Sequence, residues 1–266
     1  MIIANKYKLI NPIGEGAFGK IYSAENIRTR EMVAIKSEPI NSGTKMLKQE
    51  TKIYQYLGNK IGFPQVKWFG LENGNYYMSL TLLGDSLTIL KKRSINKPFE
   101  SNTFSLLNIF LISQKMIERV EYIHSKGLIH RDIKPDNFLM KDDEVYLIDF
   151  GLCKKWRLDN GSHMEERINR TLLGTANFIS VNVHLGIEPS RRDDLESVGY
   201  IILFMLLEED LPWATCNSHY EILKQKMVIV NKNLPVFLKK YFDYCRNLRF
   251  DAEPDYKYLI GLFIKL

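Results

Sequence analysis

Two polar segments carry side chains that could transfer a phosphoryl group. The first, residues 130–137, reads His-Arg-Asp-Ile-Lys-Pro-Asp-Asn, and the second, Asp149-Phe150-Gly151, ends an apolar run. Asp132 can accept the proton of an attacking hydroxyl group, and Lys134 can neutralise charge on the transferring phosphoryl group. A charge run is usually a solvated face, but this one is enclosed between a helical stretch and an apolar one, which favours a buried catalytic loop.

A metal site is predicted where these two segments meet. A polar turn at 141–144 separates two apolar stretches and predicts a hairpin. That hairpin would bring Asn137 and Asp149 together although they are 12 positions apart. An amide oxygen and a carboxylate are hard oxygen ligands of the kind that Mg²⁺ prefers.

A glycine-rich stretch near the N-terminus could cover phosphate groups. It reads Gly14-Glu15-Gly16-Ala17-Phe18-Gly19. A turn without any ligand is the plain alternative, and a dinucleotide-binding turn would require a helix next. Residues 20–25 instead have strand character, and a glycine loop between two strands can offer backbone N–H groups to phosphates.

Lys36 ends an apolar strand, Val33-Ala34-Ile35-Lys36. A surface lysine with a buried stem is one interpretation. The other is a partly buried ammonium group with a partner, and Glu50 on the next predicted helix is the candidate. Such an ion pair would hold the ammonium group of Lys36 in a fixed direction, where it could bind a phosphate group.

The pattern of the chain predicts an α+β fold in two parts. The first part is rich in strands, with one helix, and the rest is mostly helical, so a ligand cleft is expected near residues 82–84. Strands are predicted at 6–13, 20–25, 31–36, 66–71 and 76–82. Helices are predicted at 45–58, 103–125, 193–208, 219–227, 235–247 and 255–265.

Composition excludes several classes of protein. The chain has 266 residues, 45% hydrophobic and 26% charged, which suits a folded core rather than disorder. Its three cysteines form no Cys-x-x-Cys pair, which favours a reducing compartment. The longest apolar run, residues 198–207, is too short for the roughly 20 residues of a membrane span and predicts a buried helix. The mild net charge of +6 usually serves only solubility, and it also suits an acidic or phosphate-bearing partner.

Several longer motifs carry a family resemblance. They are Leu82-Leu83-Gly84, Ile123-His124-Ser125-Lys126, residues 130–140, His184-Leu185-Gly186-Ile187-Glu188, residues 190–197, residues 245–251 and Pro254-Asp255-Tyr256. With them the chain resembles the bilobal protein-kinase fold and, within it, the casein kinase I family. The resemblance implies a single kinase domain over residues 1–266, with lobes at 1–83 and 84–266 and no C-terminal regulatory tail. It also implies a serine/threonine protein kinase, and the alternative is a pseudokinase that serves as a scaffold or binding module.

The resemblance assigns roles to individual residues. The implied catalytic set is Lys36, Glu50, Asp132, Lys134, Asn137 and Thr175, with Lys134 and Thr175 in the serine/threonine pattern. The implied ATP-binding set is Ile13, Gly14, Glu15, Gly16, Ala17, Phe18, Gly19, Ile21, Ala34, Lys36, Leu80, Thr81, Leu83, Ser86, Leu139, Ile148 and Asp149. Asn137 and Asp149 would hold Mg²⁺. Arg131, Lys154, Arg170 and Asn177 match positions that bind an anion or the substrate.

Residues 174–190 resemble the end of a kinase activation segment, on which the substrate peptide lies. Ser180-Val181-Asn182 stands where most kinases have Ala-Pro-Glu, and Glu253 aligns with the arginine that usually pairs with that glutamate. Both halves of the ion pair are therefore replaced together. The stretch contains one charged residue, Glu188. Asp194, below the catalytic loop, is expected to hold backbone N–H groups near Arg131.

The chain departs from the family at several positions. Thr81 replaces a glutamate, Leu80 falls at the gatekeeper, and Ile89 replaces an aspartate near the ribose. Asn177 replaces an arginine that holds a phosphate already present on the substrate, while Lys224 and Lys226 could keep a weaker preference for acidic peptides. Between Gly151 and Gly174 the candidate phosphosites are Ser162 and Thr171, neither of them clear, so activity without phosphorylation is expected.

These features define the expected partners. They are ATP, Mg²⁺ and protein substrates with serine or threonine near acidic residues. We expect no nucleic-acid partner, no membrane span, a monomer, and a place in the cytoplasm or the nucleus.

Overall fold

The computed structural model describes residues 1–16, 19–43, 46–96 and 104–264. The chain forms two compact units, Met1–Gly84 with Leu139–Gly151, and Asp85–Phe138 with Leu152–Leu266. The predicted division after residue 83 differs from this in two respects, because Gly84 and the segment 139–151 belong with the first unit. Leu147 there donates its N–H to the carbonyl of Gly62 at 2.9 Å, and Gly84 donates to the carbonyl of Met140 at 2.9 Å.

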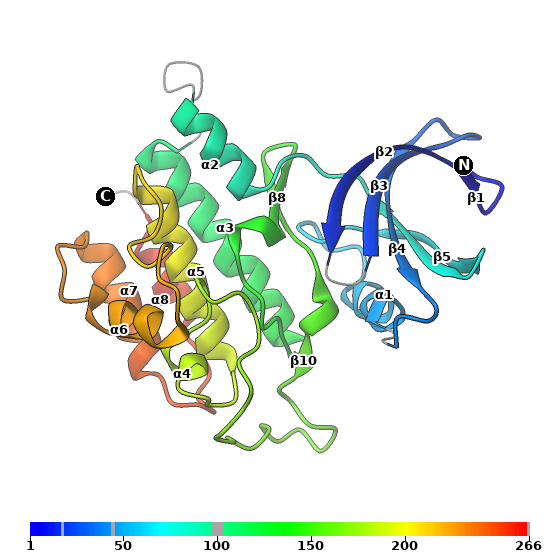
Figure 1. Cartoon of the computed structure of the whole chain (residues 1–266). Helices are drawn as coiled ribbons and strands as arrows, with labels where there is room; N and C mark the ends of the chain where they lie inside the picture. The colour runs from blue at the N-terminus through cyan, green and yellow to red at the C-terminus, as the bar shows by residue number, and fades with distance from the viewer. Residues whose placement is uncertain (17–18, 44–45, 97–103, 265–266) are drawn as a thin grey trace. The chain divides into compact units, whose positions relative to one another are not determined.

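The first unit is built on an antiparallel sheet (Figure 1). Its described strands run in the order β1-β2-β3-β4-β6-β5. Their bounds are Ile2–Ile3 (β1), Tyr7–Gly16 (β2), Gly19–Asn26 (β3), Met32–Pro39 (β4), Val66–Glu72 (β5) and Asn75–Thr81 (β6). Helix α1, Met46–Leu57, packs against β4, β5 and β6. The predicted strands and helix of this unit are confirmed to within a few residues, and β1 was not predicted.

A second, two-stranded sheet completes this unit. β8, Phe138–Lys141, and β9, Glu144–Leu147, form the hairpin that the polar turn predicted. Asp142 and Asp143 between them have φ angles of 48° and 60°. Two successive residues in the left-handed region give the turn type whose twist matches that of paired strands.

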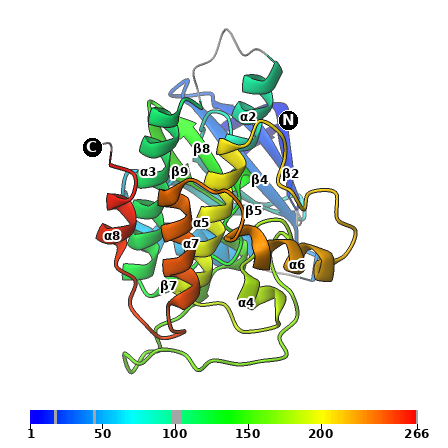
Figure 2. The same cartoon turned by 90° about the vertical axis from the view of Figure 1, so that its left-hand side faces the viewer.

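The second unit is mainly helical (Figure 2). Helix α5 lies between α3 and α7, and α8 packs on α3. The bounds are Leu87–Asn96 (α2), Leu106–Ser125 (α3), Val181–His184 (α4), Arg191–Leu206 (α5), His219–Ile229 (α6), Val236–Asn247 (α7) and Tyr256–Gly261 (α8). Short strands β7, Leu128–Ile129, and β10, Lys154–Lys155, pair antiparallel, and a 3₁₀ turn spans Pro135–Asn137.

Helix α5 explains the long apolar run in the sequence. Residues 198–205 are all buried, which confirms the predicted buried helix. The helix begins two residues earlier than expected because the Asp193 carboxylate accepts the N–H of Ser190 at 2.7 Å and caps its first turn. α8 ends earlier than predicted, and α4 was not predicted because a single turn leaves too short a periodic pattern. α2 was not predicted as a separate helix either.

Within the described ranges, no helix is both long enough and apolar enough to span a membrane.

Candidate active site

Lys36 lies between two carboxylates of the β-rich unit. Its Nζ is 2.7 Å from Glu50 Oε2 and 3.1 Å from Asp149 Oδ1. The predicted ion pair with Glu50 is thus present, and the Glu50 side chain is only 2% exposed. Burial alone would lower the pKa of Lys36, but the two carboxylates raise it above its ordinary value. Lys36 therefore carries a fixed positive charge, and burial raises the pKa of Glu50 despite that charge.

Asp149 is held in an unusual backbone conformation. Its φ is 65°, in the left-handed region that non-glycine residues rarely adopt. Tyr54 stabilises the conformation through two contacts, because the Asp149 N–H donates to the Tyr54 hydroxyl at 3.0 Å and the buried Phe150 packs edge-on against the Tyr54 ring. The Asp149 carboxyl group keeps 41% of its surface exposed, so it is accessible to a ligand.

Strand register places the predicted pocket residues on the Lys36 face of the sheet. Ile21 pairs with Lys36 across β3 and β4, and Ala34 pairs with Leu80 across β4 and β6. Side chains of directly paired strand residues share a face, as do alternate residues of one strand. Ile21, Ala34, Lys36 and Leu80 therefore line one side of the sheet. Val33 and Ile35 point to the other side, where they form a fully buried core with their neighbours.

The glycine-rich stretch joins two strands, as predicted. β2 ends at Gly16 and β3 begins at Gly19, so no helix follows and a dinucleotide-binding turn is ruled out. Ile13, Gly14 and Glu15 lie at the end of β2. Ala17 and Phe18 were also predicted to bind ATP, and they lie outside the described residues.

Gly19 has a packing role as well as its predicted one. A Cβ atom at this position would collide with the carbonyl group of Ser37 on β4. The close approach of two strands therefore requires glycine here, whether or not the loop binds phosphate.

The remaining predicted ATP contacts divide between the two units. Thr81, Leu83, Leu139 and Ile148 belong to the β-rich unit and are all half-buried. Ser86 belongs to the helical unit, where its Oγ accepts the N–H of Ile89 at 3.3 Å at the start of α2. The structure thus gives Ser86 a helix-capping role that the sequence did not indicate.

The predicted catalytic loop is a compact group of hydrogen bonds in the helical unit. Asp132 is buried, and its Oδ2 lies 2.7 Å from Lys134 Nζ. The Thr175 hydroxyl donates to Asp132 Oδ1 at 2.9 Å and accepts from Lys134 Nζ at 3.1 Å. Asn137 Nδ2 donates to the Asp132 carbonyl at 2.9 Å. Three residues, up to 43 positions from Asp132, therefore converge on its carboxylate.

Asp194 of α5 holds the backbone of this loop, as predicted. Its carboxylate accepts the N–H groups of His130 at 2.7 Å and Arg131 at 2.9 Å, and it lies 3.0 Å from His124 Nε2. Burial alone would raise the pKa of Asp194, but these hydrogen bonds and His124 lower it. The anchor is needed because Arg131 has a φ of 70°, a strained conformation for a residue with a side chain.

The two predicted metal ligands have suitable chemistry. The Asn137 amide nitrogen is directed at Asp132, which fixes the amide so that its oxygen faces away from that residue. Asp149 presents a partly exposed carboxylate in the other unit. An amide oxygen and a carboxylate fit a divalent cation that prefers oxygen ligands.

The basic residues predicted to gather an anion have an internal partner. Lys154 Nζ lies 2.7 Å from Glu188 Oε1, and Arg170 Nε lies 3.0 Å from Glu188 Oε2. Arg131 Nε donates to the carbonyl of Leu152 at 2.7 Å. Glu188 was missed as a site residue, although its position as the one charge in an apolar stretch was the available signal.

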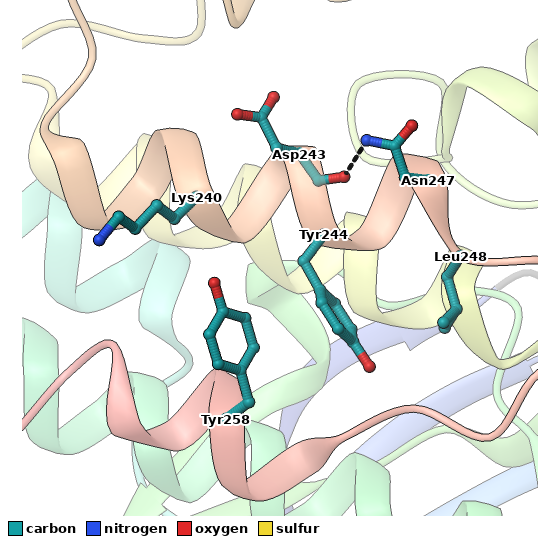
Figure 3. Close-up of a pocket in the computed structure, with 6 residues that line it drawn as sticks. All are labelled: Lys240, Asp243, Tyr244, Asn247, Leu248 and Tyr258. Carbon is teal, nitrogen blue, oxygen red and sulfur yellow. Dashed lines mark hydrogen bonds between the residues drawn. The ribbon is translucent and has the colours of Figure 1, made fainter.

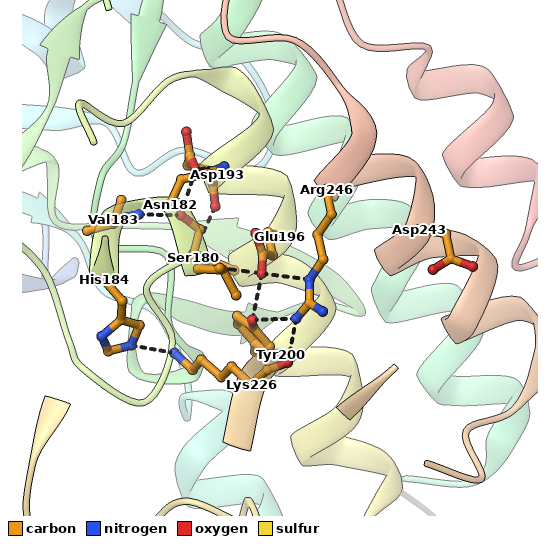
Figure 4. Close-up of polar contacts among 12 residues, drawn as sticks. Ser180, Asn182, Val183, His184, Asp193, Glu196, Tyr200, Lys226, Asp243 and Arg246 are labelled. Atoms are coloured by element: carbon orange, nitrogen blue, oxygen red, sulfur yellow. Dashed lines mark hydrogen bonds and ion pairs between the residues drawn. The ribbon is translucent and has the colours of Figure 1, made fainter. Parts of the chain in front are cut away.

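The stretch from residue 180 is fixed by carboxylates of α5 (Figure 4). The Ser180 hydroxyl donates to Asp193 Oδ1 at 2.6 Å, and Asn182 Nδ2 donates to the same oxygen at 3.2 Å. Glu253 is exposed, in agreement with the predicted loss of the usual ion pair. A different buried pair stands nearby, with Arg246 Nε 3.2 Å from Glu196 Oε1.

Lys226 does not have the predicted role. Its side chain is fully buried, and its Nζ donates to the carbonyls of Ala176 at 2.8 Å and Ile179 at 2.6 Å. Burial lowers the pKa of Lys226 to about 6. The expectation that it attracts acidic peptides is therefore wrong, whereas Lys224 is exposed. Asn177 is half-buried, and its carbonyl accepts the Trp213 indole N–H at 2.9 Å.

A separate surface depression lies between α7 and α8 (Figure 3). The ring centroids of Tyr244 and Tyr258 lie 5.2 Å apart there, with the ring planes tilted by 41°. No predicted site residue contributes to it; the lining residues are Lys240, Asp243, Tyr244, Asn247, Leu248 and Tyr258.

Gly174 gives a test of how tightly the catalytic loop is packed. Its φ is 96°, and a Cβ atom would lie 2.7 Å from the Arg131 carbonyl and 3.6 Å from Asp132 Oδ1. We expect Gly174→Ala to displace Thr175 and Asp132 and to cost about 1–3 kcal/mol of stability. The fall in kcat/KM should be about tenfold, less than the hundredfold that a 1 Å displacement can cause.

Gly161→Ala is the matched control for this substitution. Gly161 also has a positive φ, 84°, but a Cβ atom there would meet open space. Thermal unfolding and steady-state kinetics of both variants separate two effects: the cost of placing alanine at a positive φ, and the collision of its Cβ atom with neighbouring atoms. Equal losses in the two variants would contradict the crowding at Gly174.

Comparison with known families agrees with this geometry. The chain matches the family described as protein kinase domain over residues 7–253, nearly its whole length. The chain therefore belongs to the protein kinase family, with an antiparallel N-lobe sheet and a helical C-lobe. Members of this family are ATP-dependent phosphotransferases that also use a divalent metal ion.

Proposed function

We propose that this chain is an active serine/threonine protein kinase of casein kinase I type, whose substrates carry acidic or phosphorylated residues near the target hydroxyl. The observation that carries the proposal is the group formed by Asp132, Lys134 and Thr175, in which each side chain contacts the other two. A pseudokinase would have no need to retain the Asp132 carboxylate as well as Lys36, Glu50 and Asp149.

The specificity for serine and threonine is supported by the pair Lys134 and Thr175. Lys134 Nζ reaches both Asp132 and the Thr175 hydroxyl, so its charge is held next to the predicted general base. The casein kinase I type is supported by the motifs at residues 184–188 and 190–197. In the structure these motifs supply Glu188, Asp193 and Asp194, each of which is buried and fixes part of the segment or loop.

The chain's residues define a mechanism for transfer from ATP. Lys36 would bind the α- and β-phosphates, and Asn137 and Asp149 would hold a magnesium ion, which neutralises phosphate charge when it is bound. Asp132 accepts the proton of the substrate hydroxyl as the oxygen attacks the γ-phosphorus, while the bond from that phosphorus to the β,γ-bridging oxygen breaks and ADP leaves. Lys134 then stabilises charge on the transferring group, and the loop held by Asp194 keeps these side chains in place.

The test of this function is transfer of radiolabelled phosphate from ATP to casein with magnesium. We expect incorporation into serine or threonine, identified by phosphoamino-acid analysis. Labelling on tyrosine would overturn the specificity, and an absence of labelling in protein that binds ATP would favour the scaffold.

Activity should not depend on prior phosphorylation of this protein. The segment from residue 152 to 170 is already held by Arg131 and Glu188. Protein made in a host without such kinases, or treated with phosphatase and repurified, should show the same kcat/KM as untreated protein. A large loss after phosphatase treatment, restored by a kinase, would contradict this prediction.

Asn177 should limit the preference for substrates that are already phosphorylated. A neutral amide cannot form the charge-assisted hydrogen bonds that an arginine gives to phosphate, each worth about 1.5–3 kcal/mol. We therefore expect modest selectivity in the wild type. Asn177→Arg should raise it by about one to two powers of ten.

The measurement is kcat/KM on matched phosphorylated and unphosphorylated peptides. Asn177→Gln is the control, because it lengthens the side chain without adding charge. A strong preference in the wild type that Asn177→Arg leaves unchanged would show that another residue holds the phosphate.

A further inference from the structure

Glu188 joins two positions of the activation segment that are 16 residues apart. One carboxylate oxygen contacts Lys154 at 2.7 Å, and the other contacts Arg170 at 3.0 Å. The Glu188 side chain is 2% exposed. The two cations reach this buried carboxylate from the surface, since the side chains of Lys154 and Arg170 are 34% and 49% exposed.

The backbone next to Glu188 is bonded to the same segment. The Glu188 N–H donates to the Arg167 carbonyl at 2.8 Å, and the Arg170 N–H donates to the Gly186 carbonyl at 2.8 Å. The backbone that carries Glu188 is therefore fixed to the segment, and the burial of the side chain restricts the position of its carboxylate. Removing its charge would leave two cations beside a buried site with no compensating anion.

The same cluster is connected to the catalytic loop. Arg131 precedes Asp132, and its Nε fixes the Leu152 carbonyl at the start of the segment. Burial lowers the pKa of Arg131, and the negative charge of Glu188 opposes that shift. Glu188 thus acts on three cations, Arg131, Lys154 and Arg170, which lie on the catalytic loop and at both ends of the segment.

In many kinases a phosphate group orders the activation segment by pairing with basic residues. We propose that Glu188 is a positioning residue that supplies this negative charge from within the chain and so holds residues 152–170 in place without phosphorylation. The inference rests on the proposed kinase activity and names the group that makes phosphorylation unnecessary. It also means that Lys154 and Arg170 are engaged before any substrate binds.

The first experiment compares Glu188→Gln and Glu188→Ala with the wild type. Each should lower kcat/KM on casein by about ten- to a hundredfold, the effect of losing one charge-assisted hydrogen bond. Hydrogen exchange at residues 152–170 should become faster in both. Asp159→Asn is the matched control, since Asp159 pairs with Lys155 in the same segment but its side chain is 94% exposed. We expect no change in that variant.

Anion rescue distinguishes the loss of this charge from a general structural defect. Glu188→Ala leaves room beside Lys154 and Arg170, so acetate or inorganic phosphate should restore part of the activity in a saturable way. Chloride at equal ionic strength should not, and neither anion should help Glu188→Gln, in which the amide fills the space. Loss of activity without rescue by either anion would overturn the proposal, as would wild-type activity in both variants.

A third variant covers the case in which Glu188→Ala does not fold. Lys154→Gln removes a side chain that is 34% exposed and leaves Arg170 with Glu188. It should lower kcat/KM several-fold and speed exchange near residue 154, and wild-type values would overturn the proposal. If the wild type itself fails to phosphorylate casein, the proposed function fails, while exchange of the segment still tests the role of Glu188.

Discussion

Asp132→Asn should reduce kcat by about 10²–10⁴-fold, the usual contribution of a general base. The substitution keeps the size of the side chain, and the amide oxygen can still accept one hydrogen bond from Lys134 or Thr175. It removes the negative charge and with it the ability to take the proton of the substrate hydroxyl. ATP affinity should change little, because Asp132 is predicted to act on the substrate hydroxyl and is not among the predicted ATP contacts.

Asp136→Asn is the control for this prediction. Asp136 lies four residues further along the same loop, and it is exposed, so its neutralisation should leave kcat unchanged. Single-turnover kinetics and ATP titration of both variants separate chemistry from binding. Near wild-type turnover in Asp132→Asn would remove Asp132 from its catalytic role.

Glu50→Gln should have the largest effect on the stability of the β-rich unit. Removing one partner of a buried ion pair costs about 3–5 kcal/mol, and we expect about 3 kcal/mol because Asp149 remains beside Lys36. The measurement is hydrogen exchange of amides in β4 and α1, which reports the local free energy of opening. Phosphate transfer should fall as well, because Lys36 loses the group that directs its ammonium.

A double-mutant cycle isolates this pair. Lys36→Met should also destabilise, because it leaves Glu50 buried without its nearest cation. The loss of stability in the double variant should be smaller than the sum of the losses in the two single variants, by at least about 1 kcal/mol. Glu25→Gln is the surface control: its partner Arg30 is 78% exposed, so the cost should be within about 1 kcal/mol. Strictly additive losses at Lys36 and Glu50 would show that the two charges are not coupled.

The sequence alone determined the elements and the chemistry of the site. Strand and helix periods, together with the turn at 141–144, placed most of the long elements to within a few residues, with α2 as the exception. Local sequence was enough there, because backbone hydrogen bonds and side-chain periodicity act over short separations. The sequence also predicted the ion pair between Lys36 and Glu50, and the hydrogen bonds from the catalytic-loop backbone to Asp194. In each case the kinase motifs identify the residues on both sides of the contact.

Only the tertiary structure decided how the other charges are paired. Lys226 looked like a surface cation but is buried and bonded to the carbonyls of Ala176 and Ile179. Ser86 was predicted only as a ligand contact, and the structure adds its role as a helix cap. Glu188 appeared only as an isolated charge, and its two partners lie 34 and 18 positions before it. A lysine or glutamate has the same local pattern whether it is solvated or buried. Its partner is set by which distant segments the fold brings within about 3 Å, and sequence spacing does not record that contact.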